Sequence, residues 1–214
     1  MIQLDAIGKR FRYEWIFRNI STAFEAGQRY AILGPNGVGK STLMKILSGH
    51  LTPSEGKMTV QLNGKTLEAD AIYRHVNYAA PYIEVIEEFT LTEAIDFHIK
   101  FHPLCNFLKI NDLINILGFQ KSKDKEIRYF SSGMRQRLKL ALAICSDSPI
   151  LLLDEPTTNL DNQGVAWYRG LMQQYTDGTS RDNREGSNRL VIIASNAEHD
   201  YDFCDATLNI LDFK

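Results

Sequence analysis

The stretch "GPNGVGKST", Gly34 to Thr42, has the glycines, lysine and hydroxyl residues that can hold a chain of phosphates. It matches G-x-x-x-x-G-K-[ST] and lies between an apolar run, "RYAILG", and a segment with apolar residues at helical spacing. Glycine lets the backbone approach an anion closely, and the N–H groups of a helix N-terminus point at it. The expected phosphate-binding residues are Gly34, Pro35, Asn36, Gly37, Val38, Gly39, Lys40, Ser41 and Thr42.

Four residues, two in this stretch and two after a later apolar run, have side chains suited to separate roles in nucleotide hydrolysis. Lys40 would contact the β- and γ-phosphates, and Ser41 would offer its hydroxyl to Mg²⁺, a hard cation that takes oxygen ligands. The apolar run "ILLLD" ends in Asp154, which would hold Mg²⁺ through water. Glu155 follows directly and would orient or deprotonate the attacking water. The residues therefore predict an ATP and Mg²⁺ site in which Lys40 and Glu155 are catalytic.

A third group of polar residues follows the apolar run in "VIIASNAEHD", residues 191–200. Either Asn196 or His199 lies close enough to the end of this run to take part in chemistry. The local sequence does not choose between them.

These segments need a scaffold that brings strand ends together. Apolar strands separated by helical segments predict an α/β fold with a mainly parallel sheet, in which ligands bind at the carboxyl ends of the strands. The first 33 residues predict two antiparallel strands and a more apolar third one, and "KMTVQLNGKTL" predicts a hairpin that turns at Asn63 and Gly64. Residues from about 90 to 145 are helical in pattern, with a capping box at Thr90. The polar segment 176–188 predicts a loop.

Composition excludes several classes of protein. The net charge of −2 argues against a broad nucleic-acid surface. Three widely spaced cysteines fit neither a disulfide framework nor a zinc site, which favours a reducing compartment. The sequence has no signal-peptide pattern and no apolar run of the roughly 20 residues that a membrane span needs. Any membrane part is therefore expected on another chain.

One further motif indicates which nucleotide hydrolase this is. "YFSSGMRQRLKLALAI", Tyr129 to Ile144, resembles the signature motif LSGGQ of ATP-binding cassette (ABC) ATPases, and "PTTNLD", which ends at Asp161, resembles their D-loop. The resemblance covers the whole chain. It implies a P-loop NTPase core over 1–88 and 146–214, with an antiparallel β subdomain, and a small helical lobe over about 89–145.

The resemblance also implies a dimer and an adenine contact. Two subunits would sandwich two ATP molecules head to tail, and Ser131, Ser132, Gly133 and Asp161 would face the ATP held by the partner. Ser131 and Ser132 can cap a helix whose N-terminus faces an anion. An aromatic ring of the first hairpin would stack on adenine. Phe11 is the expected residue, with Tyr13 next, and core packing of that hairpin is the alternative.

The sequence departs from the family pattern at two positions. Pro81 stands where a Gln normally contacts Mg²⁺ and water, and proline has neither a polar side chain nor an N–H. Tyr82 and Glu84 are candidates to replace it. Asn196 stands where a His normally contacts the γ-phosphate; its amide can donate a hydrogen bond but cannot carry a positive charge. We therefore assign the γ-phosphate contact to Asn196 and the weaker role to His199.

The function expected from the resemblance is the ATP-hydrolysing subunit of a membrane transporter. Its partners would be a second ATPase subunit, identical or related, and an integral membrane permease, with no nucleic acid. It would lie at the cytoplasmic face of the cell membrane, where residues from Pro81 to about Phe101 would line the permease groove. Two alternatives remain: a regulatory subunit that closes on ATP but barely hydrolyses it, and a soluble ABC ATPase that acts on nucleic acid or ribosomes.

Overall fold

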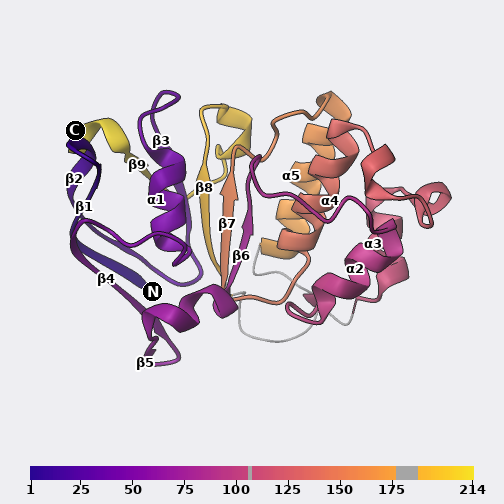
Figure 1. Ribbon diagram of the computed structural model, residues 1–214, viewed down its shortest axis with the longest axis horizontal. Helices are drawn as coiled ribbons and strands as arrows, with labels where there is room; N and C mark the ends of the chain where they lie inside the picture. The colour runs from indigo at the N-terminus through magenta and orange to yellow at the C-terminus, as the bar shows by residue number, and fades with distance from the viewer. Residues whose placement is uncertain (106–107, 177–187) are drawn as a thin grey trace. The chain divides into compact units, whose positions relative to one another are not determined.

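The computed structural model describes residues 1–105, 108–176 and 188–214 (Figure 1). Most of the loop expected at 176–188 therefore lies outside the described residues. The chain divides into two compact units. Unit 1 comprises residues 1–78, 149–155 and 188–214, and unit 2 comprises 79–148 and 156–187. The helical lobe expected over about 89–145 falls within unit 2, which also contains the segment 79–88 and a later helix.

An antiparallel sheet forms the first layer of unit 1. Its strand order is β2-β1-β4-β5. The strands are β1 (Ile2–Phe11), β2 (Glu14–Phe24), β4 (Glu55–Leu62) and β5 (Lys65–Thr66). Between β4 and β5, Asn63 and Gly64 have φ values of 50° and 74°. Two consecutive positive φ values are what a tight two-residue hairpin turn needs, so the predicted hairpin is confirmed.

The second sheet of unit 1 has the order β6-β7-β8-β3-β9, and β7, β8, β3 and β9 are parallel. These strands are β3 (Arg29–Leu33), β6 (Val76–Ala79), β7 (Ile150–Asp154), β8 (Leu190–Ala194) and β9 (Ala206–Asn209). Helix α1 (Lys40–Leu47) follows β3 and buries Leu43, Met44, Ile46 and Leu47. Strands β7 and β8 are buried along their whole length, as expected for apolar strands inside a parallel sheet.

The register of this sheet puts three strand ends in one row. Ala194 of β8 lies beside Ile32 of β3 on one side and beside Asp154 of β7 on the other. The residues that follow each strand therefore emerge at the same edge of the sheet. Strand β9 leaves the sheet at Asn209 although apolar residues follow it, because the Asn209 side chain accepts the N–H of Leu211 and starts a short 3₁₀ helix.

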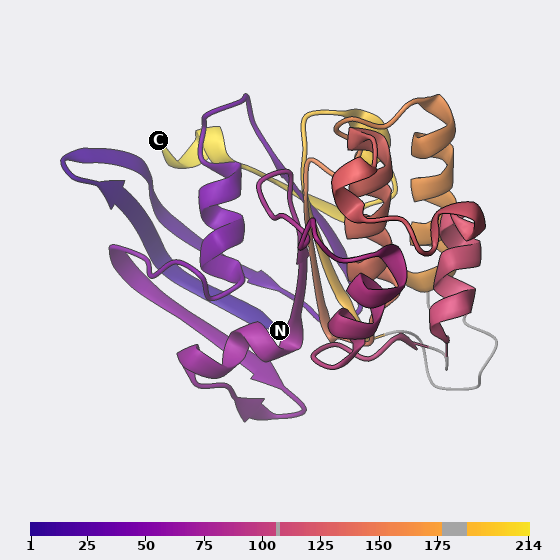
Figure 2. The same ribbon diagram turned by 45° about the vertical axis from the view of Figure 1, so that its right-hand side comes forward.

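In the described part of unit 2 there are four α-helices, of which α2 and α3, α3 and α4, and α4 and α5 contact one another (Figure 2). They are α2 (Leu91–Ile99), α3 (Ile110–Leu117), α4 (Ser132–Ile144) and α5 (Asn162–Thr176). The predicted capping box is present, because the Thr90 side chain accepts the N–H of Glu93 while Glu93 accepts the N–H of Thr90. Short 3₁₀ helices span Ala69–His75, Gln120–Ser122, Ile127–Tyr129, Glu198–Asp200 and Ile210–Phe213.

Candidate active site

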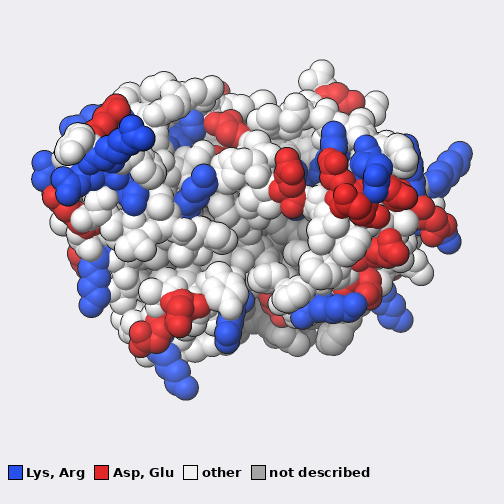
Figure 3. All heavy atoms as spheres, viewed as in Figure 1, with Lys and Arg blue, Asp and Glu red and all other residues white. Residues whose placement is uncertain are grey.

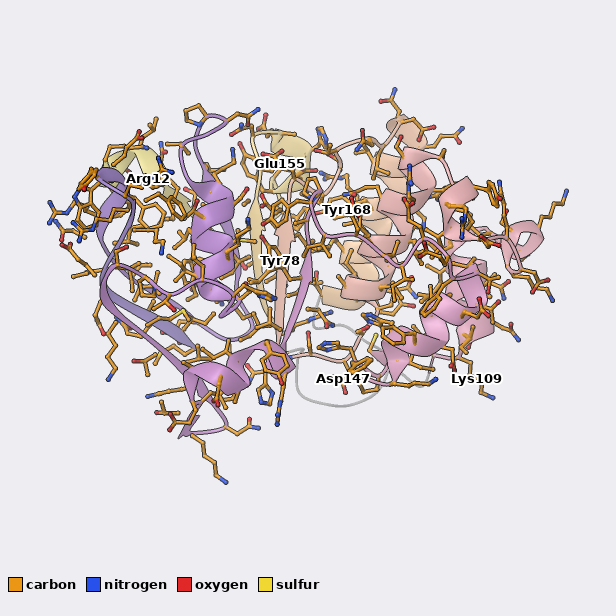
Figure 4. The ribbon with its side chains drawn as sticks, viewed as in Figure 1. Arg12, Tyr78, Lys109, Asp147, Glu155 and Tyr168 are labelled. Carbon is orange, nitrogen blue, oxygen red and sulfur yellow. The ribbon has the colours of Figure 1, made fainter. Side chains whose placement is uncertain are left out.

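The carboxyl edge of the parallel sheet carries the candidate active site of unit 1. Gly34 follows β3, Glu155 follows β7 and Ser195 follows β8. Glu155 is seen at the end of β7 in Figure 4. An edge where parallel strands end together is the usual ligand site of an open α/β sheet, so the fold itself gathers these residues.

The loop between β3 and α1 has the backbone of a phosphate cradle. Its glycines Gly34, Gly37 and Gly39 have φ values of 139°, 79° and 120°. A Cβ at Gly39 would lie 2.5 Å from Cγ2 of Ile16, so glycine is required there for both conformation and space. Gly39 is the N-cap of α1, and no side chain of the described residues caps this helix. Its first N–H groups are therefore available to an anion.

Lys40 is held at the centre of this cradle. The side chain is 5% exposed, and its Nζ donates a hydrogen bond to the carbonyl oxygen of Gly34 at 2.7 Å. The same Nζ lies 3.4 Å from Oε1 of Glu155. The structure therefore brings together the two residues that the sequence predicts to be catalytic, one from the loop after β3 and one from the end of β7.

Glu155 has a strained main chain. Its φ is 47°, in the left-handed region that costs a residue with a Cβ about 1–2 kcal/mol. Its N–H donates to the carbonyl oxygen of Ala194 at 2.8 Å, which fixes the turn after β7 on the end of β8. Strain that the surrounding structure maintains is a common property of functional sites. Here it aims the Glu155 carboxylate at Lys40 and Ser195.

The predicted magnesium ligands are both oxygen donors, which suits the ion. Asp154 is 1% exposed at the end of β7, where its Oδ2 accepts a long hydrogen bond of 3.5 Å from the Tyr78 hydroxyl. Ser41 lies in the first turn of α1. Nowhere in residues 1–105, 108–176 and 188–214 do three or more His, Cys, Asp or Glu residues gather in a way that could hold a metal. Mg²⁺ commonly binds through one or two protein oxygens plus substrate phosphates, and this donor set fits that mode.

The turn after β8 separates the roles of Asn196 and His199. Nδ2 of Asn196 donates to Oδ1 of Asn36 in the phosphate loop at 2.7 Å. His199 is about half exposed, and its Nε2 lies 3.7 Å from Oδ1 of Asp200. Asn196 therefore contacts the loop that would hold phosphate, whereas the His199 ring lies beside its own neighbour in the turn.

The signature residues lie in unit 2 and form a second group. Ser131 is the N-cap of α4, and its hydroxyl accepts the N–H of Met134 at 3.2 Å. A Cβ at Gly133 would lie 3.1 Å from the carbonyl oxygen of Asn159, a tight contact that a larger residue could make only if this carbonyl shifted. Asp161 accepts the N–H of Gly164 at 2.7 Å and caps the start of α5. Ser132 is the first residue of α4.

A groove of about 210 Å³ lies on unit 2 next to Pro81. Lys139 of α4 lines it and donates to the carbonyl oxygens of Ala80 and Pro81 at 3.2 and 3.3 Å. Burial lowers the pKa of Lys139, while the nearby Glu84 opposes this shift. Lys139 thus holds the main chain at Ala80 and Pro81 in place. It does not replace the contacts that a glutamine side chain would make at position 81.

The candidate adenine contacts lie at the tip of the β1–β2 hairpin. Phe11 is 49% exposed and Tyr13 is 97% exposed, so neither ring belongs to the core of the hairpin. Nζ of Lys9 lies 5.2 Å from the centroid of the Phe11 ring. Lysine and arginine side chains gather over this end of the sheet in Figure 3, and a cationic surface attracts an anionic nucleotide.

Sequence reasoning missed two residues of this site, Ser195 and Asp200. Both are buried, and the Ser195 hydroxyl contacts Asp200 and Glu155. Their spacing of five residues matches no helical or strand period, so no pattern singles them out. Lys139 was also missed, although its four-residue spacing from Arg135 puts both side chains on one face of α4.

Comparison with known proteins agrees with this geometry. The ABC transporter family matches residues 17–158. The chain is 30% identical to the uncharacterised ABC transporter ATP-binding protein YcbN of Bacillus subtilis (strain 168), over 81% of this chain and 56% of that protein. It is 29% identical to YybJ, described in the same words and from the same organism, over 98% of this chain and 92% of YybJ. It thus spans little more than half the length of one relative and nearly all of another.

The fold also matches solved structures. The ATP-binding cassette MJ0796, a dimer in a post-hydrolysis state bound to ADP and Pi, superposes with a TM-score of 0.80 at 19% identity, over 98% of this chain and 94% of that one. The described residues contain no helix that is both long and apolar enough to cross a membrane. From the family match, the relatives and the cradle at the end of the parallel sheet, we conclude that this chain belongs to the ABC transporter family.

Proposed function

We propose that this protein is the ATP-binding and ATP-hydrolysing subunit of an ABC transporter. The observation that carries the proposal is the contact between Lys40 and Glu155 at 3.4 Å, inside a glycine cradle at the carboxyl edge of the sheet. Lys40 would bind the β- and γ-phosphates, and Ser41 and Asp154 would hold Mg²⁺, which neutralises charge on the phosphates. Glu155 would take a proton from the water that attacks the γ-phosphate.

Dimerisation would complete each site. Ser131 caps α4, so the N-terminus of this helix can face an anion on a second subunit. Gly133 lets the backbone approach closely, and Asp161 fixes the start of α5 beside it. Two identical or related subunits would thus enclose two ATP molecules head to tail, with Phe11 of the hairpin stacking on adenine.

The partner in the membrane would be a separate permease at the cytoplasmic face. An aromatic row at α2 supports this, with Phe89 before the helix, Phe97 in it and Phe101 after it: Phe89 and Phe97 have ring centroids 5.5 Å apart, and Phe97 and Phe101 5.2 Å apart. Phe97 is 43% exposed and Phe101 65% exposed. Neighbouring apolar rings left open to water mark a contact surface, and these rings fall within the predicted segment from Pro81 to about Phe101.

Membrane binding tests this part of the proposal. Membranes are prepared from the native host after deletion of this chain. They should bind the purified protein saturably, and protease treatment of the membranes should abolish binding. We expect the double variant Phe97→Ser/Phe101→Ser to bind at least tenfold more weakly, because each exposed ring contributes buried apolar area. Tyr129→Ser is the matched control, since Tyr129 is 64% exposed on the same unit but outside the segment from Pro81 to Phe101. Equal loss in the control, or binding to protein-free lipid vesicles, would contradict the proposal.

The assignment of the γ-phosphate contact to Asn196 has its own test. Asn196→Ala should lower steady-state ATP turnover about tenfold, because one hydrogen bond to a charged group is lost. His199→Ala should stay within about twofold of the wild type, since its ring is half exposed and turned to Asp200. Turnover of ATP is measured at saturating Mg²⁺. The assignment is wrong if only His199→Ala loses activity.

A further inference from the structure

The Ser195 hydroxyl lies between two carboxylates at the end of β8. Its Oγ is 2.5 Å from Oδ2 of Asp200 and 3.5 Å from Oε2 of Glu155. Ser195 is fully buried, and Asp200 is 1% exposed. The N–H of Ser195 also donates to the carbonyl oxygen of Ile32 at 3.3 Å, so β3 holds the main chain beneath this hydroxyl.

One hydroxyl has a single hydrogen to donate, and the geometry decides where it goes. The short contact is with Asp200, so Ser195 donates its hydrogen to that carboxylate. Oγ also accepts the N–H of Ala197 at 3.0 Å. One lone pair of Oγ then remains for Glu155. While Glu155 is a carboxylate, two acceptors face each other across this gap, which accounts for the longer distance of 3.5 Å.

Proton transfer during hydrolysis would change this contact. As the water oxygen bonds to the γ-phosphorus, the bond from phosphorus to the departing ADP oxygen breaks, and the water proton goes to Glu155. Glu155 then has an O–H to donate. The remaining lone pair of Ser195 could then accept this hydrogen, since Oγ lies 3.5 Å from Oε2 of Glu155, and Ser195 would keep its own hydrogen on Asp200 throughout.

We infer that Ser195, oriented by Asp200, is a positioning residue that accepts a hydrogen bond from Glu155 once Glu155 has taken the proton. The inference rests on the proposed role of Glu155 as general base. The pair would hold the Glu155 side chain in one place, since the Ser195 hydroxyl is itself fixed by Asp200, Ala197 and β3. Neither Ser195 nor Asp200 would contact ATP, so the pair would act on the chemical step and not on ATP affinity.

The effect on the chemical step and the effect on ATP affinity can be measured separately. We expect Ser195→Ala to lower single-turnover hydrolysis about tenfold, as for the loss of one strong hydrogen bond, with the ATP dissociation constant within about twofold of wild type. Ser195→Thr keeps the hydroxyl and should retain most of the rate. Ser195→Cys fills the same site with a weak acceptor and should lose as much as Ser195→Ala. In a Glu155→Gln background, Ser195→Ala should cause no further loss, because its effect would pass through Glu155.

The matched control is Ser48→Ala. Ser48 is also fully buried in unit 1 and hydrogen-bonded, to Lys45 and His50, but it lies at the far end of α1 from the phosphate loop. It should lower the melting temperature without lowering turnover. Full activity of Ser195→Ala, or a tenfold loss that persists in the Glu155→Gln background, would overturn the positioning role while leaving the proposed function intact. Absence of Glu155-dependent hydrolysis in the wild type would overturn both.

Discussion

Glu155→Gln is expected to lower ATP turnover by roughly 10²–10⁴-fold, the usual range for loss of a general base. Glutamine keeps the size and hydrogen-bonding reach of the side chain but cannot accept a proton from water. ATP binding should persist, because the phosphate cradle and Lys40 are unchanged. Steady-state release of phosphate at saturating ATP, together with the ATP dissociation constant, measures both effects.

Glu198→Gln is the control for this change. Glu198 is an exposed carboxylate in the turn after β8, so its replacement removes the same charge near the site without touching Glu155. Turnover of this variant should equal that of the wild type. If Glu155→Gln keeps most of its activity, another group activates the water. If the wild type and Glu155→Gln both bind ATP but neither hydrolyses it, a regulatory subunit that barely hydrolyses ATP becomes the better interpretation.

Lys40→Met is expected to weaken ATP binding about 10–150-fold, which corresponds to about 1.5–3 kcal/mol for a lost hydrogen bond to a charged group. Methionine keeps the unbranched chain in its 5% exposed position but has no charge for the β- and γ-phosphates. Removing the ammonium also leaves Glu155 without the cation 3.4 Å away. Turnover should therefore fall together with affinity. Titration with a fluorescent ATP analogue measures the change.

Lys45→Met separates this effect from a general loss of charge on α1. Lys45 lies in the last turn of the same helix, away from the phosphate loop. We expect its ATP affinity to match that of the wild type. Equal weakening by both variants would mean that Lys40 acts through the overall field of the helix and not through direct contact with phosphate.

Local signals explain what the sequence predicted. A turn at Asn63 and Gly64 and a cap at Thr90 depend on residues within four positions of one another, so their physics is complete in a short stretch. The phosphate loop is similar, since its glycines determine the backbone. The α/β fold followed from buried apolar strands. The family comparisons then agreed with the signature motif.

Contacts that depend on which strands are neighbours could not be predicted from the sequence. Asn36 and Asn196 are 160 positions apart and meet only because β3 and β8 are neighbours in the sheet. The approach of Ser195 to Glu155 has the same origin, because β7 and β8 also pair. The end of β9 at Asn209 has a different cause: a side-chain cap ends the strand although apolar residues continue after it.

Because Glu155 has a left-handed backbone, thermal stability and ATP turnover favour different residues at this position. Glycine there would relieve about 1–2 kcal/mol of conformational strain and remove the carboxylate that we propose activates water. Selection for heat resistance alone would therefore favour an inactive protein at this residue, whereas selection for activity maintains the strain. A library screened only for folded protein at high temperature should accumulate the substitution Glu155→Gly, and the same library screened for ATP turnover should exclude it.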